Sequence, residues 1–520
     1  MKHFTAKLHN ISLTIAVLIS TIFTTLLFFS TLFFSFYAED MTTQISVPHV
    51  DNILLSVLLL LAVLGIIYGL NTLSLSTLEH IHKVLRILSP LYTLILGALL
   101  VIFGRSAPAA DAHSVYSIAE SFATNNLSAI QPTGDTYLSY YPQQIGLISY
   151  YELICRLWNL LPLETPAYHI IKCGNVLFAC LIVIYQYRTI HILTNNLKAD
   201  VIYLVLSLFN FPLIFYSSFV YGEVPSFACI SIGIYYLLKA EKNLQASASI
   251  APELLLSLLS LTIAVLLRKN SLVLIIAVAL TVFCRWFFTK KHLLLGFALA
   301  VCLTSVSILP LIQNIYESRA DNHLLPGVPA TSYFAMGMQE SDRGNGWYNG
   351  FNFYTYQEQN LDSEATILLS QNAIAERMDY FKENPAYAIR FYTNKYLSQW
   401  TDGTYACRQA TIQSFSQRPS ILQSIYDGSL ANVFSSFCNH YQLIIFFGAF
   451  AYSIFGRKKE ESQWTLLLYI GFIGAFGGLL FHTIWEANSR YILPYGMLLI
   501  PYAAMGLAHI PQPKRPSCQS

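Results

Sequence analysis

The sequence predicts an all-α polytopic membrane protein with about twelve transmembrane helices and two outer segments that carry short amphipathic helices. Of its 520 residues, 55% are hydrophobic and only 11% are charged, and the mean hydropathy is +0.49. Soluble domains carry about 25% charged residues. The apolar residues fall in runs of roughly the 20 residues that a helix needs to cross a bilayer. Two longer polar segments, 104–166 and 313–435, interrupt these runs.

The N-terminal segment 1–103 is expected to form three transmembrane helices. Its first apolar run, 11–37, is too long for a signal-peptide core, and no convincing cleavage site follows it. We therefore expect an uncleaved spanning helix there. A second run covers 53–70, and a third ends near Phe103.

The remaining apolar runs predict six helices within 167–312 and three within 436–520, before a short cytoplasmic tail. The outer segment 313–435 between them contains an ordered loop near 344–356. It also contains an interfacial helix at 384–400 that ends at Trp400. The expected spanning helices are 167–190, 200–219, 224–239, 252–267, 271–288, 293–312, 437–455, 463–481 and 491–509.

Basic residues in the short connectors predict the orientation of a multi-pass protein in the cell membrane. Lys and Arg are enriched in cytoplasmic loops. If both termini are cytoplasmic, the inner connectors hold far more basic residues than the short outer ones, and both polar segments face outside. The inner cations are Lys83, Arg86, Arg188, Lys198, Lys239, Lys242, Arg285, Lys290, Lys291, Arg457, Lys458 and Lys459.

Charge and cysteine usage exclude several classes of protein. The net charge of +2 provides no basic surface for nucleic acid. The nine cysteines form no C-x-x-C pair and no zinc spacing. The absence of a nucleotide-binding Gly-rich loop or P-loop argues against an ATP-driven pump and a nucleotide-sugar enzyme. No cofactor is assigned, and a divalent metal stays open. Cys407 and Cys438 either pair or remain free, and two free thiols are favoured.

The first outer segment contains the strongest candidate for a catalytic base, Asp111. A carboxylate at the edge of a bilayer is costly and usually has a task. Apolar residues at helical spacing predict two short helices, within 115–122 and 148–158, with a turn at Tyr140-Tyr141-Pro142. An alternative role for Asp111 is to cap the first of these helices, because Asp is a favoured N-cap.

Two further clusters lie at predicted outer turns. Glu223 stands in the very short turn Tyr221–Pro225, where it is either a site carboxylate or a helix-start residue favoured by the helix dipole. Arg268 and Lys269 lie between two apolar runs on the side that should lack positive charge. They are either snorkelling side chains or a phosphate clamp, and their outer position favours the clamp.

The last cluster, His482–Tyr491, places many polar side chains between two spanning helices. Arg490, beside Tyr491, is expected to bind a second phosphate oxygen. Glu486 either lines the site or pairs with Arg490 at the i,i+4 spacing of a helix. The expected acceptor-binding or site-lining residues are Tyr141, Gln143, His482 and Glu486. A base opposite a phosphate leaving group suits glycosyl transfer from a lipid-phosphate sugar.

Six stretches together resemble the bacterial membrane glycosyltransferases of the GT-C fold. The resemblance is to the family 39 type, related to protein O-mannosyltransferases and the aminoarabinose transferase for lipid A. It covers most of the chain through the predicted topology. The stretches are DAHSVYSIAESF, YYPQQIGLISYYE, YGEVPS, LRKNS, GWYNGFN and EANSRYILPY.

The resemblance implies a role for individual residues. The family's catalytic Asp in the first large outer loop maps onto Asp111, and a later acidic position maps onto Glu223. A basic residue that contacts the lipid phosphate maps onto Arg268 or Lys269. The family's late Arg-Tyr pair maps onto Arg490 and Tyr491.

The chain departs from the family pattern at three places. Two additional predicted helices precede the catalytic loop. Asp111 is followed by Ala112, where many relatives have paired acidic residues, and Tyr141-Pro142-Gln143 replaces the more usual His-Pro-Pro. The number of carboxylates in the site and the acceptor contacts are therefore expected to differ.

The sequence thus predicts an integral membrane glycosyltransferase. It would move a sugar from a polyprenyl-phosphate donor to an acceptor outside the cytoplasm, with inversion at the anomeric carbon. The partners are membrane lipid, the lipid-linked donor and a cell-envelope glycan, lipid or protein acceptor, with the oligomeric state open. Alternatives are a polysaccharide polymerase or ligase of the O-antigen type and a lipid or sugar transporter. A transporter should show related halves and mid-membrane charges, and we find neither.

Overall fold

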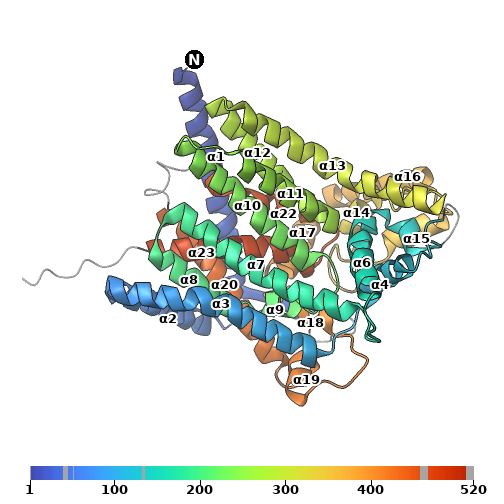
Figure 1. Cartoon of the computed structure of the whole chain (residues 1–520), viewed down its shortest axis with the longest axis horizontal. Coiled ribbons are helices and arrows are strands. Elements are labelled where there is room, and N and C mark those ends of the chain that lie inside the picture. The colour runs from blue at the N-terminus through green and yellow to red at the C-terminus, as the bar shows by residue number, and fades with distance from the viewer. Residues whose placement is uncertain (1, 39–44, 51, 132–134, 457–465, 511–520) are drawn as a thin grey trace, which may run out of the picture.

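The structure is a bundle of long helices whose shorter helices gather at one end. It is a computed structural model that describes the whole chain except residues 1, 39–44, 51, 132–134, 457–465 and 511–520. Figure 1 shows the short helices α4, α6 and α14–α16 together at the right-hand end of the bundle. The predicted all-α polytopic fold class is confirmed.

Nine helices in the described part of the chain are long and apolar enough to cross a membrane. The nine helices, some of which begin or end in a short 3-10 or π turn (η), are Ile11–Phe33 within α1 (Lys2–Phe33), α2 (Ile53–Thr72), α3 (Leu75–Gly104), α7 (Tyr168–Thr194), η2 with α12 (Lys269–Ser271, Leu272–Thr289), α13 (His292–Ala320), α20 with η3 (Ala431–Ala451, Tyr452–Gly456), η4 with α22 (Leu466–Tyr469, Ile470–Ile484) and η5 with α23 (Ser489–Ile492, Leu493–His509).

The three other predicted spans are also helical. Predicted spans 224–239 and 252–267 lie in α10 (Glu223–Gln245) and α11 (Ala251–Leu267). Predicted span 200–219 is two helices, α8 (Leu197–Leu208) and α9 (Phe211–Tyr216). The break occurs because the Asn210 side chain accepts a hydrogen bond from the Leu213 amide and caps α9.

One predicted helix is too long. The first helix was expected to continue through Tyr37, but α1 ends at Phe33. The next residues form β1 (Phe34–Ala38), which pairs with the antiparallel strand β2 (Ser46–Val50). The Phe36 amide also donates to the carbonyl of Thr401 at 3.1 Å. Aromatic residues favour strands. The strand β1 attaches the end of α1 to segment 313–435 through this bond.

The two polar segments form compact helical regions. The predicted helix near 384–400 is α17 and ends at Trp400, which is buried against Phe23 and Tyr495. The short helices are α4 (Ala110–Ala123), α5 (Tyr137–Tyr140), η1 (Pro142–Gln144), α6 (Ile145–Trp158), α14 (Ala330–Gly337), α15 (Phe351–Glu358), α16 (Ser363–Glu383), α17 (Pro385–Trp400), α18 (Cys407–Thr411) and α19 (Ser420–Asp427).

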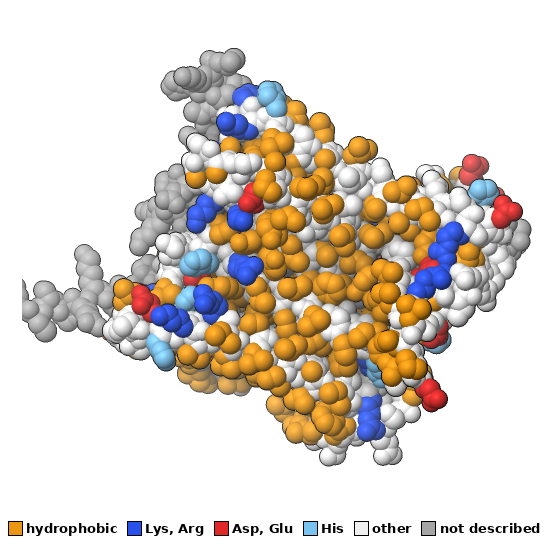
Figure 2. Space-filling model, viewed as in Figure 1, with side chains coloured by type: hydrophobic (Ala, Val, Ile, Leu, Met, Phe, Trp, Pro, Cys, Tyr) orange, Lys and Arg blue, Asp and Glu red, His pale blue; other side chains and the backbone are white. Residues whose placement is uncertain are grey.

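The surface fits a membrane protein. Hydrophobic side chains form a broad band across the face in Figure 2, and charged side chains gather toward its ends. Apolar side chains such as Leu54, Ile87 and Val306 are well exposed on the long helices. Soluble monomers rarely expose apolar patches of this extent. The predicted connector cations Arg457, Lys458 and Lys459 lie outside the described residues.

Cys407 and Cys438 are both buried free thiols, as the sequence favoured.

Candidate active site

Asp111 lies in the first turn of α4. Residues 105–109, which we call the strap, join α3 to α4. The strap is fixed to the second outer segment, because the Ala107 amide donates to the carbonyl of Gln413 at 2.9 Å. On its other side, Lys172 donates to the carbonyl of Ser106 at 2.8 Å. The N-cap of α4 is Ala109, with no side-chain cap. The alternative that Asp111 caps this helix is therefore wrong.

Glu223 and Arg268 meet because two backbone turns touch. A Cβ atom at Gly222 would lie only 2.3 Å from the carbonyl oxygen of Leu267, so a side chain there would push the turns apart. Glu223 begins α10, and Arg268 follows α11 directly. Their ion pair joins Arg268 Nη1 and Glu223 Oε1 at 2.7 Å.

Arg490 completes a buried cluster of three charges. Its Nε lies 3.6 Å from the same Oε1 atom of Glu223. The Glu223 side chain is 1% exposed, and the side chains of Arg268 and Arg490 are 12% and 20% exposed. Both guanidinium groups lie 5.4–5.9 Å from the ring centres of Tyr221 and Tyr491. Two cations share one carboxylate, so the cluster keeps a net positive charge.

Asp111 faces this cluster. It is solvent-exposed, yet close enough to Arg490 and Glu223 for electrostatic interaction. The surrounding protein raises the pKa of the Asp111 carboxyl by partial desolvation, Arg490 opposes this shift, and Glu223 adds to it. A carboxylate with a raised pKa holds a proton more readily, which is the property that a general base needs.

Glu486 lines the same site but does not form the predicted helical pair with Arg490. The backbone at Trp485 is extended, so residues 486 and 490 do not share a helix face, and Arg490 forms its ion pair with Glu223. Glu486 is 7% exposed and accepts a hydrogen bond from the Tyr491 hydroxyl at 3.4 Å. Burial raises the pKa of Glu486 to about 7, although Arg490 lowers it.

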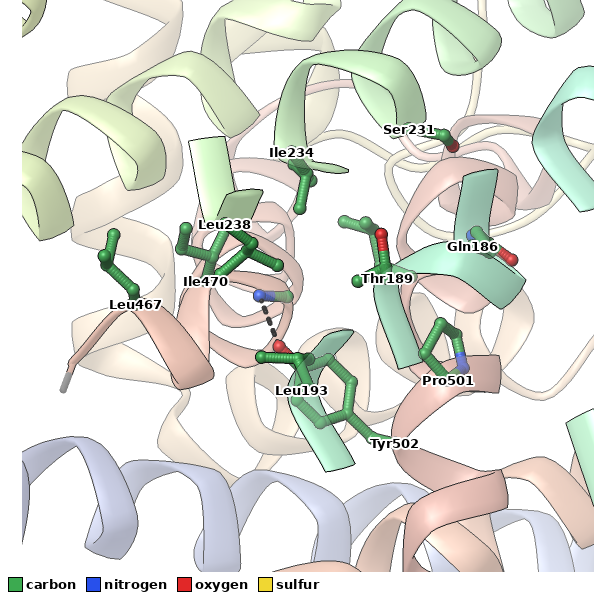
Figure 3. Close-up of a pocket in the computed structure, with 12 residues that line it drawn as sticks. Gln186, Thr189, Leu193, Ser231, Ile234, Leu238, Leu467, Ile470, Pro501 and Tyr502 are labelled. Carbon is green, nitrogen blue, oxygen red and sulfur yellow. Dashed lines mark hydrogen bonds between the residues drawn. The ribbon is translucent and has the colours of Figure 1, made fainter. Parts of the chain in front are cut away.

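A cavity extends from the charged cluster into the bundle. Glu223, Arg268 and Tyr491 line its charged end, and Phe227 and Ile230 follow along α10. A second cavity lies further along the same helix and is shown in Figure 3. Its walls are mostly apolar, and the dashed bond in that view joins the Gly471 amide to the Tyr502 hydroxyl at 3.0 Å.

The other predicted site residues differ in their exposure to solvent. Tyr141 is half-buried and interacts electrostatically with Asp111 and Glu486. His482 is buried and stacks on Tyr491, with ring centres 5.6 Å apart. Lys269 is exposed beside the cavity.

Some side chains around the site were not identified in the sequence. Gln144, the neighbour of the predicted Gln143, donates a hydrogen bond to Tyr221. Tyr348 and Arg343 interact electrostatically with Glu486 from the second outer segment. Tyr348 lies in the predicted ordered loop, but nothing in the sequence pattern directs that loop toward Asp111.

The described residues hold no group of three or more His, Cys, Asp or Glu side chains arranged to bind a metal ion. The three carboxylates of the site, Asp111, Glu223 and Glu486, lie among arginines instead.

Comparison with known proteins does not identify a family. No protein-family model and no curated protein matches the chain. One similar solved structure is the archaeal oligosaccharyltransferase AglB from Archaeoglobus fulgidus, in complex with an inhibitory peptide and a dolichol-phosphate. The match has a TM-score of 0.42 and 13% identity, and covers 82% of this chain and 50% of that chain. The chain therefore spans about half the length of that protein.

We predict that Glu223→Gln destabilises the protein by about 1–3 kcal/mol, because it leaves two partly buried guanidinium groups without their counter-charge. Thermal unfolding of the purified protein in detergent measures this loss as a lower Tm. Asp379→Asn is a matched control, since it removes a carboxylate from the exposed ion pair with Lys382. A Tm for Glu223→Gln as high as that of the control would contradict a structural role for the cluster.

Proposed function

We propose that the protein is an integral membrane glycosyltransferase that moves one sugar from a polyprenyl-phosphate donor to an acceptor outside the cytoplasm. One observation carries this proposal. An exposed carboxylate, Asp111, faces the paired guanidinium groups of Arg268 and Arg490 across one site at the end of the bundle. A base and a positively charged cluster on one site suit the transfer of a group away from a phosphate.

The reaction is a single displacement. Asp111 removes the proton from the acceptor hydroxyl as its oxygen forms a bond to the anomeric carbon of the sugar. The bond between that carbon and the phosphate oxygen breaks, and its electron pair leaves with the phosphate. Arg268 and Arg490 stabilise the charge that develops there, with Lys269 at the margin. Attack from the side opposite the leaving group inverts the anomeric carbon.

Unsatisfied hydrogen-bonding groups support donor binding at the charged cluster. Arg490 Nε and the Oε2 atom of Glu223 are buried without a hydrogen bond to any described residue, whereas Oε1 of Glu223 is held in its ion pair with Arg268. Such groups are costly unless a partner satisfies them. A phosphate oxygen accepts from the guanidinium groups, and a sugar hydroxyl next to the phosphate donates to Glu223. Glu223 also orients both arginines.

The apolar part of the donor follows the two cavities. α10 lines the first cavity with Phe227 and Ile230 and the second with Ile234 and Leu238. Figure 3 shows these last two side chains opposite Thr189 and Leu193 of α7. An isoprenoid chain matches such walls, because it buries apolar surface without requiring hydrogen bonds. The acceptor approaches from the other side, where Tyr141 and Glu486 interact electrostatically with the base, and Gln143 and His482 stay predicted acceptor-side residues.

We predict that Asp111→Asn abolishes transfer while leaving the protein folded and inserted. Asn keeps the size of Asp but cannot take a proton, and loss of a general base costs about 10²–10⁴-fold in rate. The measurement is the loss of the transferred sugar from the envelope of cells in which the variant is the sole copy. Asp135→Asn, an exposed carboxylate of the same segment, is the control. Normal transfer by a folded Asp111→Asn variant would exclude the base role and leave Glu223 as the next candidate.

Arg268→Ala should weaken binding of undecaprenyl phosphate, the leaving group of the proposed reaction, by roughly 10- to 100-fold. A hydrogen bond to a charged group contributes about 1.5–3 kcal/mol. Lys269→Ala should have a smaller effect that fades at high salt, because Lys269 is exposed. Titration of the purified protein with the lipid measures both. Wild-type affinity in both variants would mean that the cations only support the fold.

The proposed orientation places 104–166 and 313–435 outside and both termini in the cytoplasm. Cysteines introduced at the exposed positions Asn126 and Asn349 should then react with a membrane-impermeant maleimide in intact cells. A cysteine at the exposed Ser247, between α10 and α11, should react only after lysis. The reverse pattern would invert the topology. Cys518 and the exposed Cys173 and Cys302 are replaced by Ser in this background.

A further inference from the structure

The segment from Thr483 to Arg490 carries both Glu486 and Arg490, and a buried lysine of the second outer segment holds one end of it. Lys395 of α17 is 1% exposed, and its Nζ donates to the carbonyls of Gly337, Thr483 and Trp485. The last two distances are 3.0 Å and 2.8 Å. Three carbonyl acceptors match the three N–H donors of an ammonium group.

The same stretch is also attached through its backbone and one aromatic ring. The Ala487 amide donates to the carbonyl of Gly346 at 2.7 Å. The Trp485 ring stacks between Tyr333 and Phe481, with centroid distances of 4.8 Å and 5.0 Å. The turn that presents Glu486 is therefore attached to segment 313–435 at several points.

A buried aspartate holds the other end. Asp402 is 2% exposed and accepts from the Ser489 hydroxyl at 2.6 Å. Ser489 directly precedes Arg490 and is fully buried. Asp402 also accepts from the amides of Thr404 and Ala406, at 2.9 Å and 3.2 Å, which fixes its own turn.

Burying a lysine and an aspartate is costly, and apolar residues would dock α17 on the bundle at least as well. Both side chains instead direct hydrogen bonds to one segment, from opposite ends, and that segment carries two site residues. Lys395 satisfies carbonyls at the C-terminus of α22, and together the two anchors fix Glu486 and Arg490 relative to Asp111.

We propose that Lys395 and Asp402 are positioning residues that hold the 483–490 segment, so that the second outer segment sets the geometry of Arg490 at the donor phosphate. This inference rests on the proposed function. Neither residue touches the donor. Each acts through the backbone or hydroxyl that it binds.

Two variants test the anchors in the full-length purified protein. Ser489→Ala removes one link and leaves the other bonds of Asp402 in place. Lys395→Met keeps the aliphatic stem of the lysine and removes its donors. Each should weaken undecaprenyl phosphate binding by about three- to tenfold, the indirect effect expected when a displaced Arg490 weakens about one hydrogen bond to the phosphate. Thr404→Ala and Lys382→Met are the matched controls, because they remove a bond of the Asp402 turn and an exposed ammonium without touching the segment.

A nitroxide label at Thr483→Cys, in the protein with Cys173, Cys302 and Cys518 replaced, reports on the segment without any lipid. Lys395→Met should increase the mobility of this label and leave a label at Leu480→Cys on α22 unchanged. Unchanged mobility at both positions, or lipid affinities of the two anchor variants equal to those of the controls, would overturn the proposal. If the lipid fails to bind the wild type, the proposed donor is wrong, and label mobility alone decides the positioning role.

Discussion

The charged cluster of Glu223, Arg268 and Arg490 is the constraint on which the site depends. A carboxylate this deeply buried requires cationic partners, and the two it has come from the junction of α11 with α12 and from the start of α23. The cluster thus ties three helix ends together at one point. Because two positive charges meet one negative charge there, the same contacts that hold the helices also leave the cluster with a net positive charge.

The two polar segments and the helical bundle each supply a different component of the candidate site. The first outer segment brings Asp111 on the opening turn of α4, and the strap before it is fixed by Lys172. The helical bundle supplies the arginines and the apolar cavities beyond them. The second outer segment contributes no base, but it holds the turn that carries Glu486. Removing any one component would leave the others without a shared site.

Local patterns in the sequence predicted the helices and the individual candidates, because apolar runs and misplaced charges are visible one stretch at a time. They did not predict the Glu223–Arg490 contact, which joins residues distant in the chain. The i,i+4 pairing of Glu486 with Arg490 failed because it assumes a helix, whereas Trp485 is extended. The burial of Lys395 and Asp402 was not predicted, because a sequence pattern does not distinguish a buried charged side chain from an exposed one. The strand β1 was missed because its aromatic residues continue an apolar run.

In the proposed reaction, Arg268 and Arg490 bind the phosphate of a lipid-linked donor. A cryo-EM structure of the protein in lipid nanodiscs with undecaprenyl phosphate would show whether they do. We expect phosphate density within hydrogen-bonding distance of both arginines, and an isoprenoid chain beside Phe227 and Ile230 of α10. A phosphate bound elsewhere, with both arginines still paired only to Glu223, would exclude this role.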